Sequence, residues 1–271
     1  MPSNGANALS NTGLMAMIVE DINQSRIAMY LKCPRQFYYR YCEGIISPPG
    51  AALTLGSSFH RALAVNYGQK VGSYEDLPVS DVLDAFSTEF DHRGHETMWF
   101  PEDDPGKIKD SGVAILDHYQ KEAAPGIQPI CVETKFEAEM SYTVDEEPKQ
   151  IMIKGILDLQ DEDQVIVEAK TTSQKPYRVK QSHIIQTTCY VAGAMQQTGK
   201  ARVDYVVNKK IPEIVSYPIQ VDQEKIRFFV NLVAGVVESI ESELWIPNRD
   251  HFLCSEKWCG YWGLCHQQLG G

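Results

Sequence analysis

The sequence predicts an α/β fold with a small mixed sheet flanked by helices. Helical patterns come first, alternating apolar segments follow, and a long helix precedes a cysteine-rich tail. The chain has 271 residues, 43% of them hydrophobic, which is enough for a sizeable core. We expect a flexible lead over residues 1–20 and one domain over 21–271, with a helical insertion at 75–125 and the cysteine-rich tail at 247–271.

Helices dominate the first part of the chain. Proline disrupts a helix interior, so Pro34 predicts a break within the first helical segment. In the second segment, Phe59, Leu63 and Tyr67 recur at helical spacing, which indicates an amphipathic helix. The four expected helical segments are residues 23–41, 55–69, 79–98 and 107–123.

Strands alternate with helices in the second part. An acidic turn at 161–164 joins two apolar segments and predicts a hairpin. The tail from Pro247 onward is expected to be a loop. The expected strands are 129–140, 150–159, 164–170, 202–208 and 214–219, and the expected helices are 180–198 and 222–243.

The charge pattern limits the way in which the chain could meet nucleic acid. A net charge of −11 argues against indiscriminate coating of nucleic acid, because proteins that do this are usually basic. Residues 169–203 nevertheless contain no Asp or Glu and form either a local basic track or a solvated surface. Their cationic residues are Lys170, Lys175, Arg178, Lys180, Lys200 and Arg202.

Several features of other protein classes are missing from the sequence. The sequence contains no run of about 18 apolar residues, so it predicts no membrane span. The polar N-terminus lacks the basic and apolar parts of a secretory signal, so a cytoplasmic location is expected. No phosphate-binding G-x(4)-G-K-[ST] loop occurs, so helicase activity would require another chain.

Two carboxylates and a lysine are spaced for a metal site. Asp158 ends one expected strand, while Glu168 and Lys170 lie two residues apart on the next and therefore project to the same side. Converging carboxylates suit Mg²⁺ or Mn²⁺, and an adjacent ammonium can orient water or neutralise developing charge. The alternative is a charged surface hairpin.

Three further side chains could join this site. His60 on the amphipathic helix could supply an imidazole ligand, although a helix histidine is more often a satisfied core or surface residue. Gln186 and Tyr190 stand four apart on the expected helix after the hairpin, so they share one face. They could contact a base, a sugar or phosphate oxygens, or position a metal-bound water.

The seven cysteines favour metal ligation over disulfides. Their number is odd and no export signal is seen. Cys254, Cys259 and Cys265 follow a C-x(4)-C-x(5)-C spacing in the tail. They could bind zinc with His251 or His266 as a fourth ligand, or an iron–sulfur cluster with another cysteine.

Five motifs occur in the order found in RecB-like nucleases of the PD-(D/E)XK class, and the chain resembles this family over residues 25–190. The resemblance is greatest to single-domain members, namely phage-type and CRISPR-adaptation exonucleases and the nuclease domain of the AddB subunit. It implies a restriction-endonuclease-like core. The motifs are S-x(4)-Y-x(2)-CPRQFYYRY from Ser25, G-S-S-F-H at 56–60, G-I-L-D at 155–158, E-A-K at 168–170 and Q-T-T-C-Y at 186–190.

The resemblance also implies roles for these residues. His60, Asp158, Glu168 and the carbonyl of Ala169 would hold Mg²⁺ or Mn²⁺, and Lys170 would be the catalytic lysine. Gln186 and Tyr190 would contact DNA near the site and are counted with the catalytic set. Glu133 resembles a frequent acidic position of the family.

For the cysteines, the resemblance implies a 4Fe–4S cluster that joins Cys33 to the three in the tail. Such a cluster would close a loop of more than 200 residues. The usual tail spacing in the family is C-x(2)-C-x(5)-C, so the first gap here is longer. Cys42, Cys131 and Cys189 are expected to be ordinary buried residues, and Cys42 is the one alternative to Cys33 as a ligand. Trp258, Tyr261 and Trp262 could shield the cluster.

The resulting expectation is an exonuclease that acts on DNA ends, in particular single-stranded ends, in recombination, repair, phage DNA processing or CRISPR adaptation. Lys175, Arg178 and Lys180 would line the DNA track beside Lys170. Charge and stacking could also come from Arg35, Phe37, Tyr38 and Tyr39, although aromatic residues at this spacing more often belong to the core. Two alternatives are an inactive DNA-binding or assembly module and a zinc-stapled protein without a DNA role. Partner proteins of these pathways and a homo-oligomer are left open.

Overall fold

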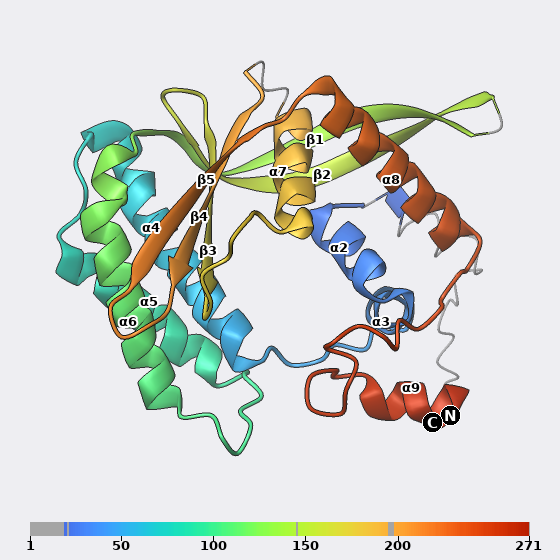
Figure 1. Ribbon diagram of the computed structural model, residues 1–271, viewed down its shortest axis with the longest axis horizontal. Coiled ribbons are helices and arrows are strands. Elements are labelled where there is room, and N and C mark those ends of the chain that lie inside the picture. The colour runs from blue at the N-terminus through green and yellow to red at the C-terminus, as the bar shows by residue number, and fades with distance from the viewer. Residues whose placement is uncertain (1–18, 21, 145, 195–197, 271) are drawn as a thin grey trace, which may run out of the picture. The chain divides into compact units, whose positions relative to one another are not determined.

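The computed structural model describes residues 19–20, 22–144, 146–194 and 198–270 (Figure 1). The expected flexible lead lies outside the described residues, except for its last two positions. Contacts divide the chain into two compact units. The terminal unit comprises Met1–Ser47, Glu137–Lys154 and Arg227–Gly271, and the central unit comprises Pro48–Phe136 and Gly155–Ile226.

A five-stranded mixed sheet is the framework of the fold, with the order β1-β2-β3-β4-β5. Strand β3 pairs antiparallel with β2, with Gln160 opposite Ile166, and parallel with β4, which in turn pairs antiparallel with β5. The strands are β1 (Pro129–Val144), β2 (Glu147–Asp161), β3 (Ile166–Thr172), β4 (Lys200–Val207) and β5 (Glu213–Gln220).

Helices of the central unit cover both faces of strands β3 to β5 (Figure 1). On one face lie α4 (Ala51–Ser73), α5 (Val79–Gly94) and α6 (Pro105–Glu122), and on the other lies α7 (Gln181–Gly193). Phe59, Phe86 and Leu116 of the first three helices pack with Val167 and Val206 of the sheet. A second cluster joins apolar side chains of α7 to the opposite face of the same strands.

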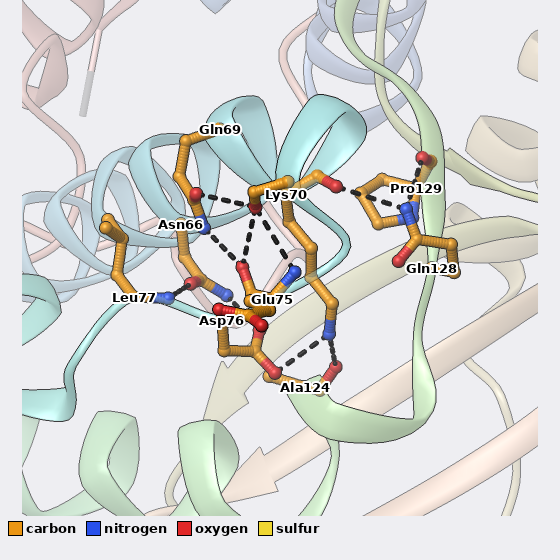
Figure 2. Close-up of polar contacts among 10 residues, drawn as sticks. Asn66, Gln69, Lys70, Glu75, Asp76, Leu77, Ala124, Gln128 and Pro129 are labelled. Atoms are coloured by element: carbon orange, nitrogen blue, oxygen red, sulfur yellow. Dashed lines mark hydrogen bonds and ion pairs between the residues drawn. The ribbon is translucent and has the colours of Figure 1, made fainter.

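A buried ion pair fixes the end of α4 (Figure 2). The ammonium of Lys70, which is 3% exposed, lies 2.8 Å from Asp76 Oδ2 and donates to the carbonyl of Ala124 at 2.8 Å. Asn66 Nδ2 donates to the other oxygen of Asp76 at 2.7 Å, and Asn66 Oδ1 accepts from the backbone N–H of Leu77 at 2.8 Å. Because its charge is paired and hydrogen-bonded, Lys70 can be buried, and it holds the loop after α4 against the segment after α6.

In the terminal unit, the N-terminal helices break at Cys33, as Pro34 predicts. Helix α2 (Gln24–Lys32) ends before Cys33, whose extended backbone precedes α3 (Pro34–Phe37) and a π-helix over Tyr38–Cys42. This unit also holds most of α8 (Gln223–Glu241) and all of α9 (Trp262–Leu269).

Aromatic rings make up much of the interior of this unit. Phe37 stacks on Trp245 at 6.0 Å between centroids, and Tyr39 stacks on Tyr261 at 5.5 Å. Phe37 and Tyr39 are fully buried, so they cannot offer their faces to nucleic acid as the sequence suggested. Their spacing along the helices is explained by the core.

The expected α/β fold and the order of its elements are confirmed, while the bounds of several elements differ from those expected. Strands β1 and β2 extend beyond their apolar residues into polar sequence, because main-chain pairing does not require apolar side chains. The tail, expected to be a loop, contains α9, which is short and has no buried residue. Helix α7 ends at Gly193, before the expected end at residue 198, and residues 195–197 lie outside the described residues. Among the described residues, none of the helices is both long and apolar enough to traverse a bilayer.

Gly112 is predicted to be required for the packing of α6. A Cβ atom at this position would lie 2.2 Å from Phe86 Cζ and 2.7 Å from Leu55 Cδ1. Gly112→Ala should lower the free energy of unfolding by about 1–3 kcal/mol, as overpacking of a core does. Urea unfolding followed by circular dichroism measures the change.

Gly68→Ala in α4 is the matched control, because nothing lies within 4 Å of a Cβ atom built there. Alanine favours a helix over glycine by roughly 1 kcal/mol, so this variant should be as stable as the wild type or more stable. Equal unfolding midpoints for the two variants would contradict the packing described.

Candidate functional site

A fully buried carboxylate forms the centre of the candidate site in the central unit. Glu168 lies on β3, in the middle of the sheet, and is 0% exposed. Burial, opposed by the nearby Lys170 charge, raises the pKa of Glu168 to about 8. Its Oε1 atom accepts no hydrogen bond of acceptable geometry. The site therefore provides less compensation than a buried carboxylate anion requires.

Two further ligand groups converge on this carboxylate. One ligand atom each from His60, Asp158 and Glu168 lies within 4.8 Å of the others. His60 Nδ1 is 3.4 Å from Asp158 Oδ2, and His60 Nε2 is 4.0 Å from Glu168 Oε1. These residues come from α4, β2 and β3. The structure thus brings together the three side chains that the sequence singled out as metal ligands.

The imidazole of His60 is held in its neutral form. Burial is the main cause of its lowered pKa, and the charge of Lys170 lowers the pKa further, while Asp158 and a hydrogen bond to the backbone of Ala169 oppose the shift. A neutral imidazole has a free lone pair for a metal ion. The hydrogen bond also places the backbone of Ala169, the fourth expected ligand, next to the His60 ring.

Lys170 lies on the same side of β3 as Glu168, as strand alternation predicts. Its ammonium is 2.7 Å from Glu168 Oε1, and its side chain is 25% exposed. The ammonium is thus reachable from solvent while it faces a carboxylate that is not. This geometry allows Lys170 to contact both a buried carboxylate and an anionic molecule outside.

Gln186 and Tyr190 of α7 lie behind the carboxylate. Gln186 Nε2 donates to Glu168 Oε2 at 3.0 Å and to Tyr190 Oη at 2.8 Å. The two residues are only 8% and 6% exposed, although the sequence led us to expect contact with DNA. Burial, together with the charges of Glu168 and Asp158, raises the pKa of the Tyr190 phenol, so it stays neutral. Their position in the structure is that of supports for Glu168.

A small cavity of about 40 Å³ adjoins His60 and Asp158. Tyr67, Tyr119 and Glu133 also line it, and the volume is sufficient for two or three waters at about 10–15 Å³ each. The sequence pointed to Glu133 but not to the two tyrosines. Tyr67 lies seven residues after His60, and its spacing in α4 is also that of an ordinary core residue.

The carboxylate-free segment 169–203 is not free of carboxylates in space. Lys175 forms an ion pair with Glu213 of β5, and Arg202 pairs with the buried Asp204 at 3.0 Å. Among the described residues, Arg178 and Lys180 have no ion-pair partner. The basic track is therefore narrower than the sequence indicated, because neighbouring strands supply carboxylates.

A second candidate site lies in the terminal unit, where four cysteines line one cavity. They are the four that were expected to act together: Cys33, Cys254, Cys259 and Cys265. His251, His266, Tyr261 and Trp262 also line this cavity. Cys42 is not among its lining residues, and Trp258, expected to shield a cluster, is 55% exposed.

Polar groups surround the cysteine sulfurs. Gln36 Nε2 donates to Cys259 Sγ at 3.1 Å, and the backbone N–H of Asn248 donates to Cys33 Sγ at 3.4 Å. Burial and the other cysteines raise the pKa of Cys254, while Arg249 lowers it. Four thiolates this close repel one another, so their joint ionisation requires a cation. Sequence reasoning did not identify Gln36, although it lies within the CPRQ segment.

We compared the chain with known proteins in sequence and in structure. The family model described as the PD-(D/E)XK nuclease superfamily matches residues 21–266. No curated protein matches the chain in sequence. The crystal structure of a candidate exonuclease from Eubacterium rectale superposes with a TM-score of 0.53 and 12% identity, over 92% of this chain and 91% of that one.

A further solved structure, that of SSO0001, has a TM-score of 0.46 and 14% identity, over 96% of this chain and 95% of that one. The family match covers most of the chain, including every residue of the two candidate sites. The chain belongs to the PD-(D/E)XK nuclease superfamily.

Proposed function

We propose that the protein is a metal-dependent DNA exonuclease that hydrolyses phosphodiester bonds from single-stranded ends. The observation that carries the proposal is the buried Glu168 carboxylate, on which His60, Asp158 and Lys170 converge. Membership of a nuclease superfamily supports the reaction class. The products would be nucleotides or short oligonucleotides.

The donor set fits Mg²⁺ or Mn²⁺. Two carboxylates provide hard oxygen ligands, His60 is neutral, and Glu168 Oε1 is a buried oxygen whose neighbouring cation is the Lys170 ammonium at 2.7 Å. We assign the ligand roles to His60, Asp158, Glu168 and the carbonyl of Ala169. A bound divalent ion would lower the pKa of a water and stabilise negative charge on the phosphodiester.

The protein's own groups would orient the reaction. Lys170 would hold the attacking water or neutralise charge that develops on the phosphate, because its ammonium reaches both Glu168 and solvent. Gln186 would fix the Glu168 carboxylate through its hydrogen bond, and Tyr190 would fix Gln186. We therefore propose that these two residues position Glu168, in place of the DNA contact expected from the sequence.

A DNA contact beside the site is supported by the loop that follows β3. Arg178 and Lys180 lie on this loop, which connects the strand of Glu168 and Lys170 to α7, and Lys175 on the same loop is paired with Glu213. Cationic side chains so close to the site can follow a phosphate backbone. Recombination, repair, phage DNA processing or CRISPR adaptation are the settings in which such an activity acts.

We also propose that the cysteine cavity holds a 4Fe–4S cluster. Four thiols from two distant segments line this one cavity, and thiolates are the usual ligands of iron–sulfur clusters. The hydrogen bonds from Gln36 and Asn248 would tune the sulfur ligands.

Substitutions at the candidate site test its role in catalysis. Asp158→Ala and Lys170→Ala should each reduce degradation of end-labelled single-stranded DNA in Mg²⁺ or Mn²⁺ by at least about 100-fold, since the first removes a metal ligand and the second removes the ammonium at the reacting phosphate. Asp163→Ala, an exposed acid in the turn between β2 and β3, should cut like the wild type. Wild-type rates in both site variants would refute the assignment. Labels at either end also give the polarity.

The raised pKa of Glu168 predicts how metal binding depends on pH. In the metal-free folded protein, Glu168 keeps its proton up to about pH 8, and a metal ion must displace that proton. Mn²⁺ affinity should therefore rise about tenfold per pH unit between pH 6 and 8 and then level off. Calorimetry in buffers of different ionisation enthalpy should show release of one proton at pH 6.5.

The same shift predicts the sign of the effect on stability. Because the pKa of Glu168 is higher in the folded than in the unfolded protein, the metal-free protein should become less stable as the pH rises from about 4.5 to about 8. The Glu168→Gln variant should bind Mn²⁺ weakly at every pH, and the stability of its metal-free form should no longer fall as the pH rises through this range. A Mn²⁺ affinity of the wild type that does not change with pH would contradict the buried, protonated carboxyl group.

The metal content of the purified protein tests the cluster assigned to the cysteines. Anaerobically purified protein should be brown and contain four iron and four sulfide ions per chain. Serine at any of the four cavity cysteines should reduce the iron content sharply, whereas Cys42→Ser in the same unit should retain it. A colourless protein that contains one zinc ion would show that zinc occupies the cavity.

A further inference from the structure

Tyr177 is an exposed aromatic residue on the loop between β3 and α7. Its side chain is 84% exposed, more than any other large apolar side chain among the described residues. The loop begins after Thr172 and ends before Gln181. It therefore joins the strand that carries Glu168 and Lys170 to the helix that supports Glu168.

The backbone on both sides of Tyr177 is held in place. Tyr217 Oη donates to the carbonyl of Pro176 at 2.6 Å, and the backbone N–H of Lys180 donates to Tyr205 Oη at 3.1 Å. Lys175 is paired with Glu213 of β5. A ring on an anchored backbone loses little conformational entropy on binding, which is the advantage of a preorganised contact.

One cationic side chain lies beside this ring, and others lie near the end of its loop. The guanidinium of Arg178 lies 5.3 Å from the centroid of the Tyr177 ring. Lys170 and Lys180 both act on His183, where burial and then these two charges lower the pKa to about 4. The end of the loop at Lys180 therefore lies near Lys170, where the phosphate would react.

We propose that Tyr177 stacks on a base of the single-stranded DNA that enters the site and is a positioning residue for unpaired strands. Every base offers a π-face to an aromatic ring, whereas the interior bases of a duplex are already stacked on their neighbours. The adjacent Arg178 would meet the backbone of the same strand. This inference rests on the proposed nuclease function and names the feature that selects its substrate.

Binding measured without divalent metal tests the contact. Labelled oligothymidylate should bind Tyr177→Ala about 5- to 150-fold more weakly than wild type, the range expected for one stacked base, while Tyr177→Trp should bind as the wild type does. On an abasic oligonucleotide of the same length, wild type and Tyr177→Ala should bind equally. Loss that is equal on both oligonucleotides would show a backbone effect and overturn the proposal.

Tyr74→Ala is the matched control, because Tyr74 is 70% exposed and caps the C-terminal end of α4, fourteen residues after His60. At about 1.5 Å per residue this is roughly 20 Å from the site, so binding should be unchanged. In Mg²⁺, Tyr177→Ala should raise KM for single-stranded DNA with little change in kcat and leave duplex cleavage unchanged.

Two failures are distinguishable in these assays. If the wild type neither binds nor degrades DNA, the proposed function is wrong and the inference falls with it. If the wild type degrades single strands and Tyr177→Ala does so with the same KM, the inference alone is overturned.

Discussion

The carboxylate of Glu168 lies on a central strand that is covered by helices on both faces, and water does not reach it. A buried carboxylate is unfavourable unless positive charge and hydrogen-bond donors compensate it. Lys170 and Gln186 compensate it in part, and one oxygen still lacks a hydrogen bond. Asp158 adds a second negative charge beside it, so a cation held by Glu168, His60 and Asp158 would supply the compensation that the protein groups leave incomplete.

The cysteine cavity in the terminal unit presents the same physical problem in another chemical form. Four thiols from two distant segments share one cavity, and ionisation of one opposes ionisation of the next. Each site therefore gathers potential anions that a metal ion or cluster would compensate. The two differ in ligand type: carboxylates and imidazole suit a hard divalent ion at the reacting phosphate, while thiolates suit a structural iron–sulfur cluster.

Much of this could be predicted from the sequence, because helix and strand periodicity are local properties. The spacing of Glu168 and Lys170 on one strand predicted their shared side, and the hairpin predicted the approach of Asp158. The partners of Lys175 and Arg202 were not predictable in this way, since Glu213 and Asp204 come from neighbouring strands. The grouping of Cys33 with the tail likewise depended on family resemblance, because more than 200 residues separate them.

Whether Glu168, His60 and Asp158 bind a metal ion together can be measured by anomalous diffraction from a crystal soaked in Mn²⁺. We expect one anomalous peak in contact with all three side chains, with the Lys170 ammonium displaced from Glu168 Oε1 or sharing it. Manganese bound elsewhere, with Glu168 still paired only with Lys170, would contradict this assignment.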